Sequence, residues 1–386
     1  MKRRFIGLLG IALIGAVVLT GCSGGNSASD KGIRKEASQK KESKKETVDV
    51  GIVLPTKDEP RWLQDQEHFG ENLKKEGIKN QVFFSQGSSE TEKKNIEKLI
   101  GMGMKVLIIC SHDTSKAVEA VEMAKKAGVT IIAYDRMITG TDAVDYYISS
   151  DVVGIGEVQA KFLVDNIIPG TKLVPLYLYA GAISDNNSFV LFQGVWNVIQ
   201  PKLADGTFNL INSKVGRALA KKPKLTDAEI KKIVTEITTD WDPNVAKTKI
   251  SKDLAAVKPI YKGDVAVLAP NDGTARAMVD VLEADPKITS YVISGQDGEV
   301  ASMQSILDGK QKMTLFKDIR VFTGDAVTVA KDVLAGNTPK TDAVTNNRKK
   351  DVPTKYVEDT VVDIKNVKEI ISKSGYYDVK EFKGLE

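Results

Sequence analysis

The chain has 386 residues, of which 42% are hydrophobic and 27% charged, with 31 Gly and 12 Pro. This composition is typical of a globular protein long enough for two domains, and it excludes low-complexity, collagen-like and disulfide-rich proteins. With only two Cys and two His, the chain has no disulfide framework and little material for a zinc site, so we predict neither a metal nor a cofactor.

The net charge of +4 is concentrated at the start of the chain. Residues 1–47 hold ten Lys and Arg against four acidic side chains, so the remainder carries a small net negative charge. A slightly acidic body without a basic stripe argues against a nucleic-acid partner.

The first 21 residues are typical of an export signal. Three basic residues precede an apolar run over 5–19, which is too short to span a bilayer but is typical of a signal peptide, here residues 1–21. The run closes with Leu19-Thr20-Gly21-Cys22, which resembles the bacterial lipobox; a chance Cys is the alternative. Residues 22–47 then form a lipidated Cys and a flexible polar tether. We therefore expect a lipid anchor on the outer face of the cell membrane of a bacterium with a single membrane.

From residue 48 the chain alternates between short apolar runs and amphipathic stretches. The runs over 48–54, 81–84, 106–110, 130–133 and 146–149 predict strands, and the stretches over 62–76, 90–102, 115–127 and 154–166 predict helices. The strands are nearly continuous in apolar residues, as expected where helices cover both faces of a parallel sheet. The pattern predicts a doubly wound α/β fold.

A second series of the same kind follows. It predicts strands over 173–179, 208–212, 265–269, 291–294 and 313–316, and helices over 187–203, 245–256 and 274–284. One sheet of so many strands would be unusually large, so we predict two similar domains. Residues 213–238 are predicted to be a surface insertion that contains one helix over 226–236. Thr226 and Glu229 form a capping box at the start of this helix.

Polar side chains stand just after seven of these strands, where ligands bind in open α/β sheets. One of these seven strands is a further short strand predicted over residues 235–238. The residues are Asp58, Arg61 and Trp62; Asp135 and Arg136; Asp185, Asn186 and Asn187; Asp240, Trp241 and Asp242; Asn271 and Asp272; Gln296 and Asp297; Lys317 and Asp318. Paired donors and acceptors engage vicinal hydroxyls, and a Trp face stacks on the C–H patch of a sugar ring. Asp and Asn after a strand also serve as turn formers and helix caps, but seven such loops together favour a small polyol ligand.

The motifs Tyr-Asp-Arg-Met at 134–137, Asp-Asn-Asn at 185–187 and Ser-Gly-Gln-Asp at 294–297, with Asn271-Asp272 and Phe316-Lys317, resemble a known family in order and spacing. They are similar to the type I sugar-binding proteins of bacterial ABC importers, in the branch that binds xylose or several monosaccharides. The resemblance runs from about Asp49 to Tyr377. It implies a periplasmic-binding-protein type I fold, in which two lobes are joined by three crossover segments near residues 149–150, 316–317 and 342–343.

The resemblance also implies an N-terminal lobe of residues 48–149 and 317–341 and a C-terminal lobe of residues 150–316 and 342–386. A sugar would bind between them, and Trp62 and Trp241 would stack on opposite faces of its ring. The implied ligand-binding residues are Arg61, Trp62, Asp135, Arg136, Asn187, Trp241, Asn271, Asp297 and Lys317. The insertion at 213–238 is longer than in the simplest members, just before Trp241.

We therefore predict a monomeric, non-enzymatic receptor that captures a monosaccharide of the xylose, glucose, galactose or arabinose type and delivers it to an ABC permease. No catalytic residue is predicted. A sugar sensor that reports to a membrane histidine kinase is the alternative, and a glycosidase is a more distant one. The other notable residues are assigned to structure: Trp196 to the core and Cys110 to a buried strand, whereas His112 fits either the cleft or a surface loop.

Overall fold

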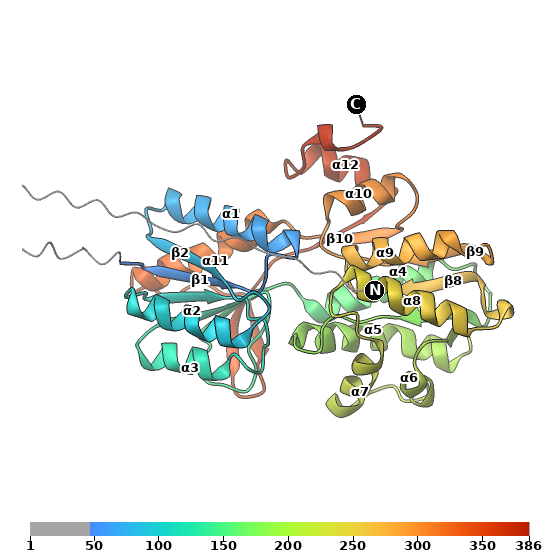
Figure 1. Ribbon diagram of the computed structural model, residues 1–386, viewed down its shortest axis with the longest axis horizontal. Coiled ribbons are helices and arrows are strands. Elements are labelled where there is room, and N and C mark those ends of the chain that lie inside the picture. Colours follow the sequence, from blue (N-terminus) through green and yellow to red (C-terminus); the bar gives the residue numbers. More distant parts are fainter. Residues whose placement is uncertain (1–46, 386) are drawn as a thin grey trace, which may run out of the picture. The chain divides into compact units, whose positions relative to one another are not determined.

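The computed structural model describes residues 47–385 (Figure 1). The predicted signal sequence, Cys22 and all but the last residue of the predicted tether lie outside the described residues. Within residues 47–385, none of the helices is both long and apolar enough to cross a membrane. The strands predicted over 48–149 form one parallel sheet and those predicted over 173–294 form another, whereas the strand predicted over 313–316 belongs to neither.

The first sheet has seven strands in the order β11-β12-β5-β4-β3-β1-β2. All neighbours pair in parallel except β11 and β12, which form an antiparallel hairpin at the edge. The strands are β1 (Val50–Leu54), β2 (Asn80–Phe84), β3 (Val106–Ile109), β4 (Thr130–Tyr134), β5 (Tyr146–Ser149), β11 (Ala343–Asn346) and β12 (Asp351–Tyr356).

Helices cover both faces of this sheet, as the continuous apolar strands predict. On one face lie α1 (Pro60–Lys75) and α11 (Ile319–Leu334), and on the other α2 (Ser89–Gly101) and α3 (Val118–Lys126). The start of each helix has a local cause: α1 begins with a proline, whose missing N–H needs no partner there, and Ser88 caps α2 by accepting from the backbone of Thr91. This sheet with its four helices is called the first lobe.

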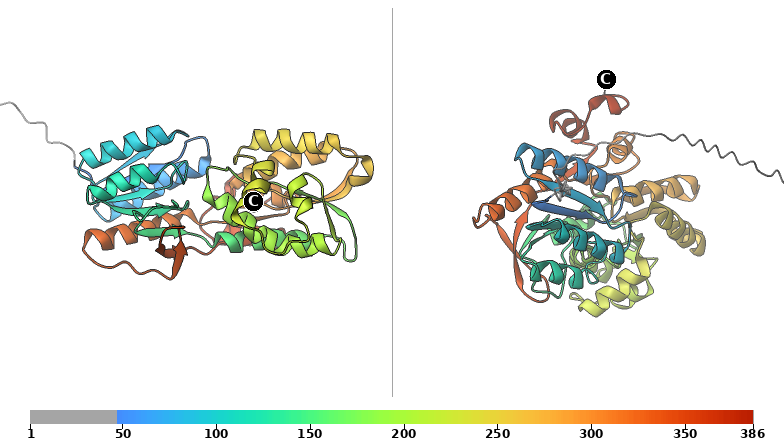
Figure 2. Two further views of the ribbon diagram at one scale, coloured as in Figure 1. Left: turned by 90° about the horizontal axis from the view of Figure 1, so that it is seen from below. Right: turned by 60° about the vertical axis from the view of Figure 1, so that its left-hand side comes forward.

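The second sheet has four parallel strands in the order β7-β6-β8-β9. These are β6 (Val174–Leu178), β7 (Phe208–Leu210), β8 (Gly263–Leu268) and β9 (Ile288–Ile293). One face is covered by α4 (Val152–Asn166), α5 (Asn186–Ala204) and α7 (Asp227–Ile237), and the other by α8 (Pro243–Ala256) and α9 (Asp272–Ala284) (Figures 1 and 2). The short helix α6 (Lys214–Ala218) contacts α7. This sheet with its six helices is called the second lobe.

The helices α4 and α5 pack unusually closely because a glycine stands on each. A Cβ atom on Gly156 would lie 2.1 Å from the carbonyl oxygen of Leu191, and one on Gly194 would lie 2.0 Å from that of Val153. The contact holds α5 firmly, and the first turn of α5 carries Asn187.

Three segments of chain pass between the lobes. The first follows β5 at residues 149–151, and the second follows β10 (Met313–Phe316) and leads into α11. The third follows β12 and leads to β13 (Thr360–Asp363), which pairs with β10 in an antiparallel two-stranded sheet. A small apolar core links these two strands to α10 (Val300–Leu307) and α12 (Val367–Lys373).

The structure corrects three expectations. The third crossing was predicted near residues 342–343, but β12 pairs with β5, so residues 343–356 extend the first sheet and the chain crosses after Tyr356. Residues 213–238 are not merely a surface insertion, because α7 buries Ile230, Ile233, Val234 and Ile237 in the core of the second lobe. Residues 235–237 end α7 rather than form a strand, and only Thr238 forms a β-bridge, with Ala180. The predicted capping box of Thr226 and Glu229 is confirmed.

Candidate functional site

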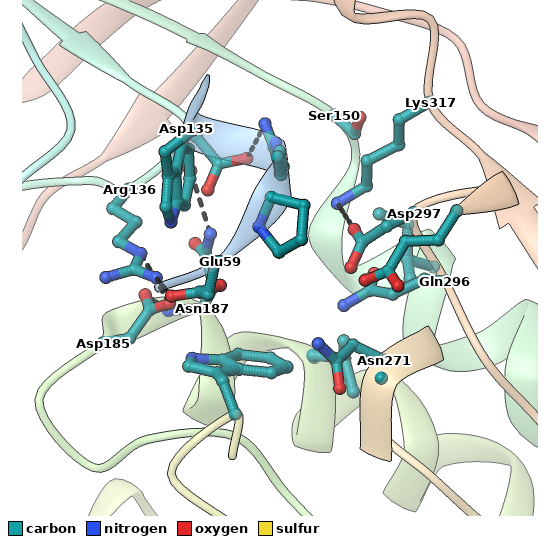
Figure 3. A pocket seen from close by; sticks show the side chains of 18 of the residues that line it. Glu59, Asp135, Arg136, Ser150, Asp185, Asn187, Asn271, Gln296, Asp297 and Lys317 are labelled. Atoms are coloured by element: carbon teal, nitrogen blue, oxygen red, sulfur yellow. Dashed lines mark hydrogen bonds and ion pairs between the residues drawn. The ribbon is translucent and has the colours of Figure 1, made fainter. Parts of the chain in front are cut away.

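A cavity of about 270 Å³ lies where the carboxyl ends of strands from both lobes meet (Figure 3). All nine residues that the sequence predicts for the ligand site line it, and they come from segments up to 256 positions apart. From the first lobe and its crossing segment come Arg61, Trp62, Asp135, Arg136 and Lys317, and from the second lobe Asn187, Trp241, Asn271 and Asp297. The structure thus brings the predicted set together, while their contact with a ligand stays a prediction.

Three of these residues have a backbone conformation that non-glycine residues seldom adopt. The φ angles of Asp135, Trp241 and Asp297 are 62°, 60° and 106°. Positive φ in such residues is uncommon, and it is concentrated at functional sites, where the surrounding structure compensates its cost. Around Asp135 this support includes the Tyr147 hydroxyl, which donates to the Asp135 carbonyl oxygen at 2.9 Å.

Asp135 lies in a strongly positive part of the wall. Arg61 Nη2 is 2.8 Å from Asp135 Oδ1, and Arg61 Nε is 3.5 Å from Asp65 Oδ2 on the next turn of α1. Burial acts to raise the pKa of Asp135, but the charges of Arg61, Lys317 and Arg136 outweigh it and lower that pKa below its ordinary value. Asp135 is therefore a carboxylate at neutral pH and offers its oxygens only as acceptors.

An ion pair joins the two lobes at one end of the cavity. Arg136 Nε is 3.0 Å from Asp185 Oδ2, and the two residues are only 5% and 2% exposed. Beside this pair the Asn187 amide donates to the Asp135 carbonyl oxygen at 2.9 Å. Burial raises the pKa of Asp185, and the Arg136 charge opposes that shift. The loop after β4 is thus held directly against the first turn of α5.

The opposite end carries a second charge pair, seen on the right of Figure 3, in which Lys317 Nζ is 3.4 Å from Asp297 Oδ1. Nearby, Asn271 caps α9 with its side-chain oxygen, which accepts from Thr274 N at 3.2 Å and from Thr274 Oγ1 at 2.7 Å. Among the described residues none accepts from the Asn271 amide nitrogen. The two N–H groups of the Asn271 side-chain amide are therefore available as donors at the cavity wall.

The two tryptophans differ in a way that the sequence does not reveal. Trp241 is half-buried and rests on Gly181, where an added Cβ atom would lie 2.1 Å from the indole ring. Trp62 is 1% exposed, and the guanidinium carbons of Arg61 and Arg136 lie 4.6 Å and 5.3 Å from its ring centroid. The predicted stacking of both on one sugar ring stays a prediction, and Trp241 offers the more open surface.

Several lining residues were absent from the predicted set: Glu59, Ser150, Asp185, Arg276, Gln296 and Glu299. The Ser150 hydroxyl and the Gln296 side-chain oxygen are buried, and neither has a hydrogen-bond partner within the described part of the chain. The sequence places Asp185 and Gln296 in the polar loops that follow strands, but the resemblance does not include them among the nine residues. Ser150 follows β5 directly, so the same rule would have found it. Arg276 stands on the second turn of α9, where that rule does not reach.

Other polar residues after strands have structural roles. Asp242 and Asp318 cap α8 and α11, and the fully buried Asp272 accepts from the Gln311 amide and the Glu299 backbone. His112 does not line the cavity, and Cys110 is a buried thiol whose pKa burial raises. Trp196 is 2% exposed and belongs to the core of the second lobe. Residues 47–385 contain no cluster of His, Cys, Asp and Glu that could hold a metal ion.

Known proteins resemble the chain over most of its length. A family model described as a periplasmic binding protein domain matches residues 50–338. The chain is 31% identical to the multiple sugar-binding periplasmic protein of Azospirillum brasilense, over 86% of this chain and 91% of that protein. It is 30% identical to the D-xylose-binding periplasmic protein of Escherichia coli, over 86% and 92%. A solved carbohydrate transporter solute-binding protein from Chloroflexus aurantiacus, in complex with D-glucose, is 49% identical with a TM-score of 0.86, over 88% of this chain and 99% of that one.

Proposed function

Because the chain belongs to the periplasmic binding protein family, we propose that it binds a monosaccharide of the glucose or xylose type between its two lobes and delivers it to an ABC importer. The convergence of the nine predicted residues on one cavity carries this proposal. The glucose complex of the Chloroflexus aurantiacus protein and the name of the Escherichia coli relative support the choice of sugar.

The chemistry of the cavity suits a neutral polyol. Asp135 supplies ionised acceptor oxygens, and Arg136, Asn271 and Lys317 supply donors, so vicinal hydroxyls find partners of both kinds. The half-exposed Trp241 supplies an apolar face for the ring. A sugar held by these groups would lose its hydration and regain most of its hydrogen bonds from the protein.

The sugar also supplies the free energy for closure of the lobes. Asp135 and Arg136 belong to the first lobe, whereas Asn271 and Asp297 belong to the second, so one ligand contacts both. A ligand shifts a two-state equilibrium only by its difference in affinity for the two states, and contacts from both lobes exist together only when the lobes are closed. The closed form would then be what the permease recognises. No catalytic step is part of the proposal.

Titration calorimetry with xylose, glucose, galactose and arabinose tests the binding step. We expect at least one of them to bind with one site per chain. Small-angle scattering with and without that sugar tests closure, because the liganded protein should be more compact. Closure would be refuted if the scattering curve did not change with any sugar at saturating concentration. The proposed function would be refuted if the protein bound none of the sugars.

We further propose that Cys22 carries a lipid that holds the protein on the outer face of the membrane. The support is the lipobox-like sequence at 19–22 and the polar stretch that follows. Cys22→Ala should release the protein into the medium, whereas the neighbouring substitution Ser23→Ala should not. A Cys22→Ala protein that stays with the membrane after a high-salt wash would contradict the lipid anchor.

A further inference from the structure

A second cavity of about 300 Å³ adjoins the candidate sugar site. It shares five wall residues with the first cavity: Pro60, Arg61, Arg276, Asp297 and Glu299. The two spaces are similar in size, so a second ring of the same kind has room beside the first.

At Arg61, Arg276 and Glu299 the boundary between the two cavities is not bridged by polar contacts. On one side Arg61 pairs with Asp65 and Asp135, all within the first lobe. On the other side Arg276 pairs with Glu299 at 2.5 Å, within the second lobe. Among residues 47–385, no hydrogen bond or ion pair joins Arg61 to either Arg276 or Glu299.

The lining of the second cavity combines polar and apolar groups. The Tyr376 hydroxyl donates to the Gln64 side-chain oxygen at 3.1 Å, and both side chains line the cavity. Val300, Ala301 and Ile319 add apolar surface. A sugar ring presents hydroxyls at its rim and C–H groups on its faces, and this lining offers partners for both.

We propose that the second cavity is a subsite for the substituent of a glycoside, so that the protein accepts a disaccharide whose first ring lies in the main cavity. This inference rests on the proposed function, because the first ring must occupy the sugar site. The proposal implies linkage selectivity, since only a substituent directed toward the shared wall, which includes Arg61 and Asp297, would reach the second cavity.

The test fills the second cavity from opposite walls. Ala301 on α10 and Gln64 on α1 are exposed and line only the second of the two cavities. We would make Ala301→Trp and Gln64→Trp separately in the full chain, with Ala255→Trp on the exposed face of α8 as the matched control. Thermal unfolding checks that each variant folds. Calorimetry then compares glucose and xylose with maltose, cellobiose, isomaltose and xylobiose.

We expect the parent to bind at least one disaccharide. Either filling substitution should weaken that binding by about tenfold or more, because the added indole occupies the space that the second ring needs and overpacking is unfavourable. Both should leave the affinity for the monosaccharide within about twofold, as surface substitutions usually do. The Ala255→Trp control should bind both ligands like the parent.

Different results would refute the disaccharide subsite and the proposed function. If the parent binds a monosaccharide but none of the disaccharides, the subsite is refuted and the proposed function stands. Disaccharide binding that neither filling variant weakens also refutes the subsite. If the parent binds no sugar of either length, both proposals fall.

Discussion

Gly181 determines where the Trp241 indole lies, although it need not contact a ligand itself. A Cβ atom at Gly181 would stand 2.1 Å from two atoms of the indole ring. Non-bonded carbons approach to about 3.5 Å at the closest comfortable distance, so Gly181→Ala forces the ring back by roughly 1.5 Å. We expect this shift to remove much of the stacking of Trp241 on the sugar.

The size of the effect follows from what stacking contributes. Stacking of a planar base on an aromatic side chain contributes about 1–3 kcal/mol, and we take the same range for Trp241→Ala with a sugar. Gly181→Ala should therefore weaken binding by up to roughly a hundredfold, since about 1.4 kcal/mol corresponds to each factor of ten. The melting temperature should change little, because Trp241 is half-exposed and can move outward.

Calorimetry on the two single variants and the double variant gives the decisive comparison. If both substitutions act through the same ring, their effects will not add, and the double variant will bind like Trp241→Ala. Gly324→Ala on α11 is the matched control, because an added Cβ atom there meets nothing within 4 Å. Unchanged affinity in Gly181→Ala, or fully additive effects, would refute the reasoning.

The other predictions concern charge, pH and packing. Arg136→Ala or Asp297→Ala should lower the sugar affinity measured by calorimetry by at least about a hundredfold, since each leaves a buried charged partner unpaired. Each should also abolish the compaction seen by scattering. Retained compaction would contradict this prediction. Burial raises the pKa of Glu92 from 4.5 to about 7, so the folded protein holds a proton that the unfolded chain releases, and stability is lost as pH rises through this range. In urea unfolding, the decrease in the free energy of unfolding with rising pH should be smaller in Glu92→Gln than in the parent by up to about 3 kcal/mol. Parallel pH profiles of the two proteins would contradict this prediction. Gly194→Ala should destabilise the fold by roughly 1–3 kcal/mol, because its Cβ atom meets a backbone oxygen that cannot move aside, whereas Gly324→Ala should not.

The sequence by itself predicted most strands of the two sheets and the loops that line the cavity. Continuous apolar runs such as 50–54 and 106–109 are buried in full, since a parallel sheet with helices on both faces leaves such strands no exposed side. One physical rule, that loops after parallel strands meet at one edge, singled out the polar loops, and the resemblance to sugar-binding proteins then selected the nine candidates among their residues. This rule is local in sequence and needs no knowledge of which strands are neighbours.

Elements whose form depends on distant partners were missed. Residues 319–334 are rich in β-branched side chains, which favour strands, yet they form α11 because Phe322, Ala326 and Ala330 pack on the first sheet. Residues 351–356 form β12 because β5, some 200 positions earlier, offers an edge to pair with. Propensity carries no information about such partners.

The roles of chemically identical residues were likewise decided only by the tertiary structure. Asp135 and Asp272 both follow a strand, but one faces the cavity and the other is buried against Gln311. Trp62 and Trp241 were predicted as a pair, but two guanidinium groups lie over the first while the second remains half-exposed. Exposure and charge environment depend on what the rest of the chain brings alongside a residue, and the residue's own position in the sequence does not contain that information.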